Sequence, residues 1–290
     1  ISDNPLANTY IESSEDNQNI SITQENNNQS GNVIHHVLIL DSLYKANRKE
    51  NPEKSLSYAK DMYNESSTIN NNELIQSALL NIADVYYDLR EFDSAYQYVV
   101  ASIKLSKTSK NINTTARSYY LLSDVNYYHG EHIEGIENAM KAIQLYSQIE
   151  DSVKIARLYK ELAILYREIG KFEIAIDYAK QSLDFFLRNN DSLHISDALR
   201  TIASLYPDTV NQKQRLKRLF LARQYLTNYR NSDINRIVLK SISVIYSRLK
   251  QFDSAYIIQK EMLNYVVKSG DKVRIANTYL SMGNTLMRMD

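Results

Sequence analysis

Apolar positions recur every 40 residues through most of the chain. When the sequence is set in rows of forty, one column holds only large aliphatic residues: Ile82, Leu122, Leu162, Ile202, Ile242 and Met282. The adjacent column holds small residues from the second repeat onward, namely Ala83, Ser123, Ala163, Ala203, Ser243 and Gly283, whereas the first repeat has Leu43. Repeats of this length are typical of stacked supersecondary units, in which each unit contacts mainly its neighbours. The pattern therefore predicts a solenoid rather than a domain with one central core.

Within each repeat the apolar spacing is helical. Leu79, Ile82, Ala83 and Tyr86 are separated by three, one and three residues, which puts them on one face of a helix. A second set with helical spacing follows after a short turn. The chain has only 3 Pro and 6 Gly in 290 residues, which favours helices over turn-rich β structure. Each repeat is therefore expected to be a pair of helices.

A polar column lies directly before each first helix. All of its members are Asn or Asp: Asn71, Asn111, Asp151, Asp191, Asn231 and Asp271. A side-chain oxygen at this place accepts hydrogen bonds from the free N–H groups of the first helical turn, which typically contributes about 1 kcal/mol. We expect these residues to be N-caps rather than functional groups.

Each repeat resembles the tetratricopeptide repeat (TPR), in which aromatic, small and aliphatic residues stand at fixed positions. One repeat matches through Tyr159, Leu162, Ala163, Tyr166, Gly170, Phe172 and Ala175. The resemblance covers residues 33–290, and the 40-residue period is similar to that of bacterial peptide receptors and membrane-tethered regulators. It implies an all-α fold: a right-handed TPR superhelix (α-α solenoid) of six helix pairs plus a final single helix.

The fifth repeat departs from the pattern at two positions. Pro207 follows Tyr206, and a proline stops or kinks a helix. We therefore expect the first helix of this repeat to end near Tyr206, with a loop through about Asn211. Arg215 stands where other repeats have Ala or Gly, and we expect it to point outward or to lie in a widened helix contact.

Residues 1–32 form a separate segment that is rich in Asn and shows no helical period. The segment carries five acidic residues and no Lys or Arg, although the whole chain has a net charge of zero. Its low apolar content predicts a disordered arm or tether. It is either a spacer from a membrane anchor or a simple unfolded terminus.

Composition excludes several classes of function. Zero net charge gives no general electrostatic attraction to nucleic acid, so we expect no nucleic-acid partner for this segment. The absence of cysteine excludes disulfides and thiolate zinc sites. No run of 18 apolar residues is present, so we expect no membrane insertion by this segment.

The sequence contains no motif typical of catalysis. There is no P-loop, Rossmann glycine pattern or nucleophile elbow. His129 and His132 flank Gly130 with too few further ligands for a metal, and His132 stands in a column that holds Phe in other repeats. We expect a protein that is not an enzyme, with no metal and no cofactor.

The resemblance to TPR proteins implies a ligand groove lined by the first helices of the pairs. The inward positions, opposite the packing face, are first aromatic and acidic and then basic, with Lys160, Arg200 and Lys240 at 40-residue spacing as a cationic ladder. The expected groove residues are Tyr44, Leu80, Asp84, Tyr87, Tyr120, Asp124, Tyr127, Arg157, Lys160, Arg167, Arg200 and Lys240. The competing interpretation is a solvated face without a ligand.

Two functions fit these features. One is a protein- or peptide-binding TPR scaffold, exported or membrane-tethered in a bacterium. The other is the sensory or ligand-binding domain of a larger signalling or transcriptional regulator whose output domain lies beyond residue 290. Asp-Ser/Thr-apolar triplets, such as Asp253-Ser254-Ala255, are similar to an O-glycosylation motif of exported bacterial proteins, and they favour a periplasmic or membrane-anchored location over a cytoplasmic one. The same triplets also suit helix starts.

The last helix predicted by the pattern has apolar residues that no second helix covers. Leu280, Leu286, Met287 and Met289 give it a surface less polar than that of a typical capping helix. We expect further repeats or an output domain in the natural protein. We also expect weak self-association through this C-terminal edge.

Overall fold

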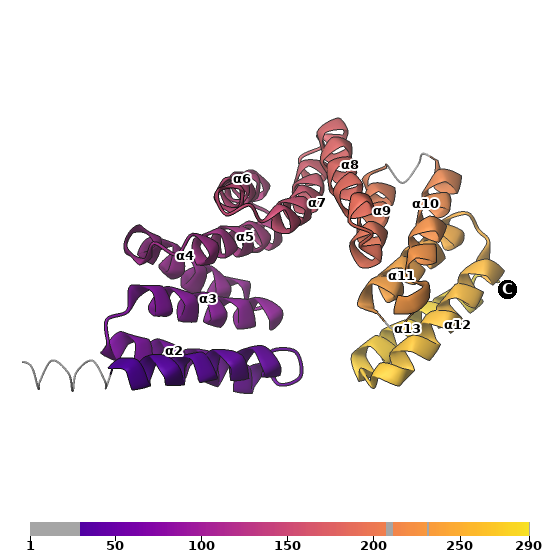
Figure 1. Ribbon diagram of the computed structural model, residues 1–290. Coiled ribbons are helices and arrows are strands. Elements are labelled where there is room, and N and C mark those ends of the chain that lie inside the picture. The colour runs from indigo at the N-terminus through magenta and orange to yellow at the C-terminus, as the bar shows by residue number, and fades with distance from the viewer. Residues whose placement is uncertain (1–29, 207–210, 231, 290) are drawn as a thin grey trace, which may run out of the picture. The chain divides into compact units, whose positions relative to one another are not determined.

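The computed structural model describes residues 30–206, 211–230 and 232–289, and these residues form helices with no strand among them (Figure 1). The first helix covers residues 30–47, so residues 30–32, which we assigned to the arm, are helical. Residues 1–29 of the expected arm lie outside the described residues. The helices that follow are α2 (Pro52–Thr68), α3 (Asn72–Asp88), α4 (Phe92–Ser109), α5 (Ile112–His129), α6 (His132–Gln148), α7 (Ser152–Glu168), α8 (Phe172–Arg188), α9 (Ser192–Leu205), α10 (Gln212–Tyr225), the 3-10 helix η1 (Thr227–Tyr229), α11 (Asp233–Arg248), α12 (Phe252–Ser269) and α13 (Lys272–Leu286). This order confirms the expected all-α architecture of helix pairs with a final single helix.

The chain divides into two compact units, Ile1–Gly130 and Glu131–Asp290. In the first unit, α2 packs on α3, α3 on α4, and α4 on α5. In the second unit, each helix from α6 to α13 packs on the next in the same way. The first helices of successive repeats also contact each other directly: α3 contacts α5, and α7 contacts α9.

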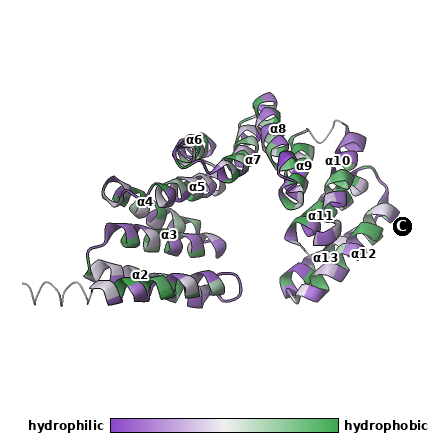
Figure 2. Cartoon of the chain, in the orientation of Figure 1, coloured by the Kyte–Doolittle hydropathy of each residue, from purple (hydrophilic) through white to green (hydrophobic). Residues whose placement is uncertain are grey.

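The small-residue column is where the two helices of a pair come close. Ala83 of α3 and Ala95 of α4 are both completely buried, and so are Ala163 of α7 and Ala175 of α8. Figure 2 shows hydrophobic and hydrophilic residues alternating along each helix rather than a helix that is apolar throughout. Each helix is therefore amphipathic, and its apolar face is buried against its neighbours.

The Asn/Asp column forms the expected N-caps. The side chains of Asn71, Asn111, Asp151, Asp191 and Asp271 each accept a hydrogen bond from a backbone N–H in the first turn of the next helix. Asn231 lies outside the described residues. The cap of α11 is the following residue, Ser232, whose Oγ accepts from the N–H of Asn235 at 3.2 Å. The prediction for this repeat is therefore wrong by one residue.

The first helix of the fifth repeat ends where proline requires. The helix α9 stops at Leu205, Tyr206 is extended with ψ 136°, and α10 begins at Gln212. Residues 207–210, which fall in the predicted loop, lie outside the described residues. The helix end near Tyr206 is confirmed.

Of the two arrangements expected for Arg215, the outward one is wrong. Its side chain is buried, with 8% exposure, and its Nε donates a hydrogen bond of 2.9 Å to the carbonyl oxygen of Ala203. In a continuous helix this oxygen would accept from the N–H of residue 207, but a proline has no N–H. Arg215 therefore replaces the donor that Pro207 lacks, which explains why this repeat has an arginine where others have Ala or Gly.

This pairing predicts a coupling between the two residues. We expect Arg215→Ala to lower the free energy of unfolding by about 2 kcal/mol, because it leaves a buried carbonyl without a donor. In a Pro207→Ala background the loss should be much smaller, since residue 207 then supplies an N–H. Urea unfolding of the natural chain, the two single variants and the double variant measures the coupling. Lys217→Ala, on the exposed side of α10, is the control. Equal losses in both backgrounds would contradict the explanation.

Candidate functional site

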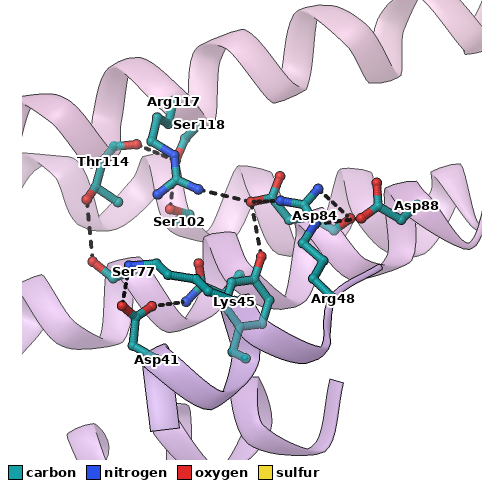
Figure 3. A network of polar contacts seen from close by, with 12 residues as sticks. Asp41, Lys45, Arg48, Ser77, Asp84, Asp88, Ser102, Thr114, Arg117 and Ser118 are labelled. Atoms are coloured by element: carbon teal, nitrogen blue, oxygen red, sulfur yellow. Dashed lines mark hydrogen bonds and ion pairs between the residues drawn. The ribbon is translucent and has the colours of Figure 1, made fainter. Parts of the chain in front are cut away.

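A polar network centred on Asp84 joins the inward positions of three helices, which are the first helices of repeats one, two and three (Figure 3). The Asp84 Oδ2 atom accepts a hydrogen bond from the Tyr44 hydroxyl at 3.3 Å and pairs with Arg48 at 3.2 Å and Arg117 at 3.1 Å. Arg48 also donates from Nε to Asp88 Oδ2 at 2.6 Å. Asp84 is 8% exposed, so its carboxylate is used within the protein rather than presented to a ligand.

Burial and charge act in opposite directions on this carboxyl group. Burial raises the pKa of Asp84, whereas the guanidinium groups of Arg48 and Arg117 act to lower it. Burial also raises the pKa of the Tyr44 phenol, and the nearby Asp84 adds to that rise. The Asp84 carboxylate is thus surrounded by two guanidinium groups and by a Tyr44 phenol that stays protonated and can donate to it. This arrangement fits a structural link between helices.

Tyr44 and Leu80 do not line an open groove, so the prediction is wrong for these two residues. Tyr44 is 2% exposed because it packs against Ile82 and Val85 of α3. Leu80 is 1% exposed because it belongs to a core cluster with Leu121 of α5. In both cases the neighbouring first helix covers the side chain.

The remaining candidates of the first unit are half-buried. Tyr87 makes edge contacts with the rings of Phe92 and Tyr128, whose own rings stack at 4.2 Å. Tyr127 has an edge contact with Tyr128 at 5.3 Å. The two other predicted residues of this unit, Tyr120 and Asp124, are also half-buried and have interactions within the chain.

In the second unit, two members of the expected cationic ladder share one acid. The Asp197 carboxylate pairs with Lys160 Nζ at 2.7 Å and with Arg200 NH2 at 2.6 Å. The positive charges of Lys160 and Arg200 lower the pKa of Asp197 well below its usual range, against the effect of burial. Lys160 also pairs with Glu161 at 3.1 Å, so the two basic side chains face two acids and do not form a free cationic surface.

The other basic candidates differ in their surroundings. Arg167 contacts Glu168 and donates from NH1 to the Ser204 hydroxyl at 3.3 Å. Arg157 is half-buried, and Lys240 is exposed. Within the second unit, the five basic candidates therefore do not form one uniform cationic surface.

A hollow of about 410 Å³ lies farther along the same face, between the first helices α11 and α13. Its side on α11 includes Val244, Ser247 and Arg248. Its side on α13 includes Asn277, Leu280, Ser281, Asn284 and Thr285, and Arg288 lines it from the turn just after this helix. Val244 and Leu280 expose 40% and 65% of their surface, so apolar side chains are accessible beside amide and hydroxyl groups.

Gln259 of α12 also lines the hollow, and its side chain is held in place by α13. Its Nε2 donates to the hydroxyls of Ser281 at 2.9 Å and Thr285 at 3.0 Å. Its Oε1 atom is buried and has no hydrogen-bond partner among the described residues. Such an unpaired acceptor is uncommon in native structures and can mark a site that a ligand or water completes.

The sequence contained signals for the residues that the prediction missed. Asp197 and Asn277 stand in the 40-residue column of Arg117 and Arg157, and Asn284 stands in that of Asp84. The expected groove in the second unit contains only the basic residues of these columns and ends at Lys240, so it leaves out all three. Asn277 and Asn284 extend the same columns into the last helix.

The described residues show neither a metal-binding cluster nor a membrane-spanning helix. They contain no group of three or more His, Asp or Glu side chains placed to hold a metal ion. Within the same ranges, no helix has both the length and the apolar character needed to span a bilayer. The hollow on α11 and α13 is therefore the strongest candidate site.

The acid shared by Lys160 and Arg200 predicts a pH-dependent stability. Because the pKa of Asp197 is lower in the folded chain than in the unfolded chain, its contribution is present above pH 4 and is lost as the pH falls further. We expect Asp197→Asn to cost about 2 kcal/mol at neutral pH and progressively less below pH 4. Urea unfolding across this range tests it, with the exposed Asp177→Asn as control. A loss that does not change with pH would contradict the assignment.

Comparison with known proteins supports the repeat. The tetratricopeptide repeat family model matches residues 114–188. No curated protein sequence matches the chain significantly.

Several solved structures share the fold. The apo form of RapI is 15% identical, with a TM-score of 0.59, and the match covers 88% of this chain and 98% of RapI. A Rap protein complexed with Competence and Sporulation Factor is 11% identical, with a TM-score of 0.58 and coverage of 83% and 71%. A signal transduction ATPase with a tetratricopeptide repeat sensor, from Pyrococcus horikoshii, is 16% identical, with a TM-score of 0.62, and the match covers 86% of this chain and 39% of that protein. The family model thus identifies tetratricopeptide repeat sequence at residues 114–188, and the solved structures show that the chain has the tetratricopeptide repeat fold.

Proposed function

We propose that the chain is a non-enzymatic scaffold that binds an extended segment of a protein or peptide on its first-helix face, in the hollow between α11 and α13. The observation that carries this proposal is the hollow itself. It combines accessible apolar side chains, Val244 and Leu280, with the amides of Asn277 and Asn284. A peptide needs both kinds of group, because its side chains seek apolar contact and its backbone seeks hydrogen bonds.

The structural relatives support binding of this kind without defining the ligand. One of them, a Rap protein, is complexed with Competence and Sporulation Factor. At 11% identity that likeness concerns the fold alone. The alternative, a sensory domain with an output domain beyond residue 290, uses the same hollow as its input site and remains a second proposal.

We also propose that the protein is exported or membrane-tethered in a bacterium, facing the periplasm. Its support is the set of Asp-Ser/Thr-apolar triplets, although Asp151 and Asp191, which begin two of them, are N-caps in the structure. Peptide mass spectrometry of the native protein tests the glycan: an unmodified Ser254 and Ser94 would remove this support.

Removing the two kinds of ligand contact should weaken peptide binding. Peptides selected on the intact chain from a random heptapeptide library should bind the double variant Leu280→Ser with Asn284→Ala at least tenfold more weakly, because both an apolar contact and a backbone hydrogen bond are lost. The matched control is Leu221→Ser, an exposed leucine on the second helix α10. Fluorescence polarisation measures the affinities. Selected peptides that bind all three proteins equally would contradict the location of the site.

Self-association through the C-terminal edge stays a prediction, supported by exposed apolar side chains on and next to α13. Val273, Tyr279 and Met287 expose 70%, 57% and 79% of their surface. We expect sedimentation velocity to show a weak, concentration-dependent dimer that Met287→Lys disrupts. A strictly monomeric chain at all concentrations would contradict it.

A further inference from the structure

A second hollow, of about 310 Å³, opens where the fifth repeat turns into the sixth. Its lining comes from the second helices α10 and α12, from η1 and from the first turn of α11. It shares no lining residue with the hollow between α11 and α13. Sites for small molecules typically enclose roughly 300–1,000 Å³, so this second hollow has the size for a small ligand.

The second hollow exists because the fifth repeat builds its turn differently. The helix α10 has 14 residues, whereas α8 has 17 and α12 has 18, and the short helix η1 follows it. Arg230 has a right-handed backbone with φ −57°. Its column holds the left-handed turn residues of the other repeats: Asn70, Lys110, Glu150, Asn190 and Gly270. The early end of α10 leaves space that the last turn of a longer second helix would fill.

Two lining residues of the second hollow are polar where other repeats are mainly apolar. Arg223 stands in a column whose other members are Tyr63, Ile103, Ile143, Leu183 and Leu263. Asn235 stands in a column whose other members are Ile75, Thr115, Ile155, Ile195 and Ile275. Because asparagine is smaller than isoleucine and carries an amide, the fifth repeat gains both room and polarity at this place.

The charges of the lining leave one arginine uncompensated. Arg223 is balanced, since its NH2 group contacts both carboxylate oxygens of Glu261 at 2.7 Å. Glu261 is the one acid among the lining residues that the structure describes. Arg230 is exposed, and no hydrogen bond or ion pair joins its guanidinium group to another described residue. Its backbone is fixed, because its carbonyl oxygen accepts from Asn235 Nδ2 at 2.7 Å.

The surrounding helix favours the same sign of ligand charge. The 14 residues of α10 include five basic and no acidic side chains. A surface with an excess of one charge raises the local concentration of ligands that carry the opposite charge. An anion is therefore favoured over a neutral or basic molecule in the second hollow.

The apolar part of the lining restricts the anion further. Phe220 and Leu226 line the second hollow beside the polar groups. An inorganic anion gains nothing from these two side chains, and a neutral apolar molecule leaves Arg230 without a partner. We propose that the second hollow binds a small organic carboxylate, whose carboxylate group accepts from Arg230 and whose apolar part lies against Phe220 and Leu226.

Three small probes test this chemistry on the intact chain by NMR titration. Hexanoate has both the charge and the apolar part, hexanol has only the apolar part, and acetate has only the charge. We expect hexanoate to saturate one site with a dissociation constant at least about fivefold lower than that of hexanol, since the contact is charge-assisted but partly exposed. It should also bind at least about tenfold more tightly than acetate, because it buries more apolar surface.

Two variants locate the site. Arg230→Gln should remove the difference between hexanoate and hexanol, whereas Arg188→Gln, an exposed arginine in the last turn of α8, should keep it. Asn235→Ile restores the residue of the other repeats and should abolish saturable binding by filling the hollow. Thermal unfolding checks that each variant is folded. Because Asn235→Ile also removes a hydrogen bond, Arg230→Gln decides the question if that variant does not fold.

The results that would overturn the inference are distinct from those that would overturn the proposed function. Hexanoate that fails to saturate, that binds no better than hexanol, or that binds Arg230→Gln as tightly as the natural chain would overturn the carboxylate site. Unchanged binding to folded Asn235→Ile would overturn its location. Peptides selected for the hollow between α11 and α13 should bind Arg230→Gln and the natural chain equally, whatever the result with hexanoate.

Discussion

The structure depends on a pair of adjacent residues that fixes where the first helices α3, α5, α7, α9 and α13 begin. The earlier residue of the pair has a left-handed backbone, as in Asn70, Lys110, Glu150, Asn190 and Gly270, with φ between 50° and 70°. The later residue caps the next helix with its side chain. In three of these turns the capping residue also donates its own N–H to the last turn of the previous helix, as Asp151 does to Tyr146 at 3.0 Å. Both helix ends are thus satisfied within two residues.

This turn holds the repeat at 40 residues, and the fixed period determines which side chains meet. Tyr44 contacts Asp84, Arg48 contacts Asp88, and Asp41 accepts from Asn81, each pair being 40 residues apart. The buried Asp84 is tolerated because the same register places Arg48 and Arg117 beside it. A buried acid without such partners would be strongly destabilising. The register therefore decides whether a polar side chain at an inward position is a structural link or a ligand contact.

The fold could be predicted from the sequence because the period, the helical spacing and the caps all indicate the same element boundaries. The exceptions arose where one residue compensated for another. The size of Arg215 predicted either an outward side chain or a widened helix contact, whereas its hydrogen bond to Ala203 follows from the N–H that Pro207 lacks. The N-cap of α11 is Ser232 rather than the expected Asn231, since Ser caps a helix as well as Asn does.

The candidate site could be predicted only in part. Spacing along a helix gives the direction of a side chain, but it does not tell how much of that side chain the next helix covers. Tyr44 and Leu80 were therefore placed on the correct face at the wrong depth. Asp197 shows the same limit for charge, because a ladder of basic residues keeps its potential only if no acid stands between its members. The hollow depends on two helices together and could not be seen in the columns of one.

The most direct test of this account removes one complete repeat. Deleting residues 151–190 joins Glu150 to Asp191, so a left-handed turn residue again precedes a capping residue and every later column keeps its register. Deleting residues 151–170 instead joins a second helix to a second helix and breaks the register. Urea unfolding followed by circular dichroism should show a cooperative transition and unchanged helicity per residue for the first deletion, and loss of both for the second. Equal behaviour of the two deletions would contradict the claim that the 40-residue register holds the fold together.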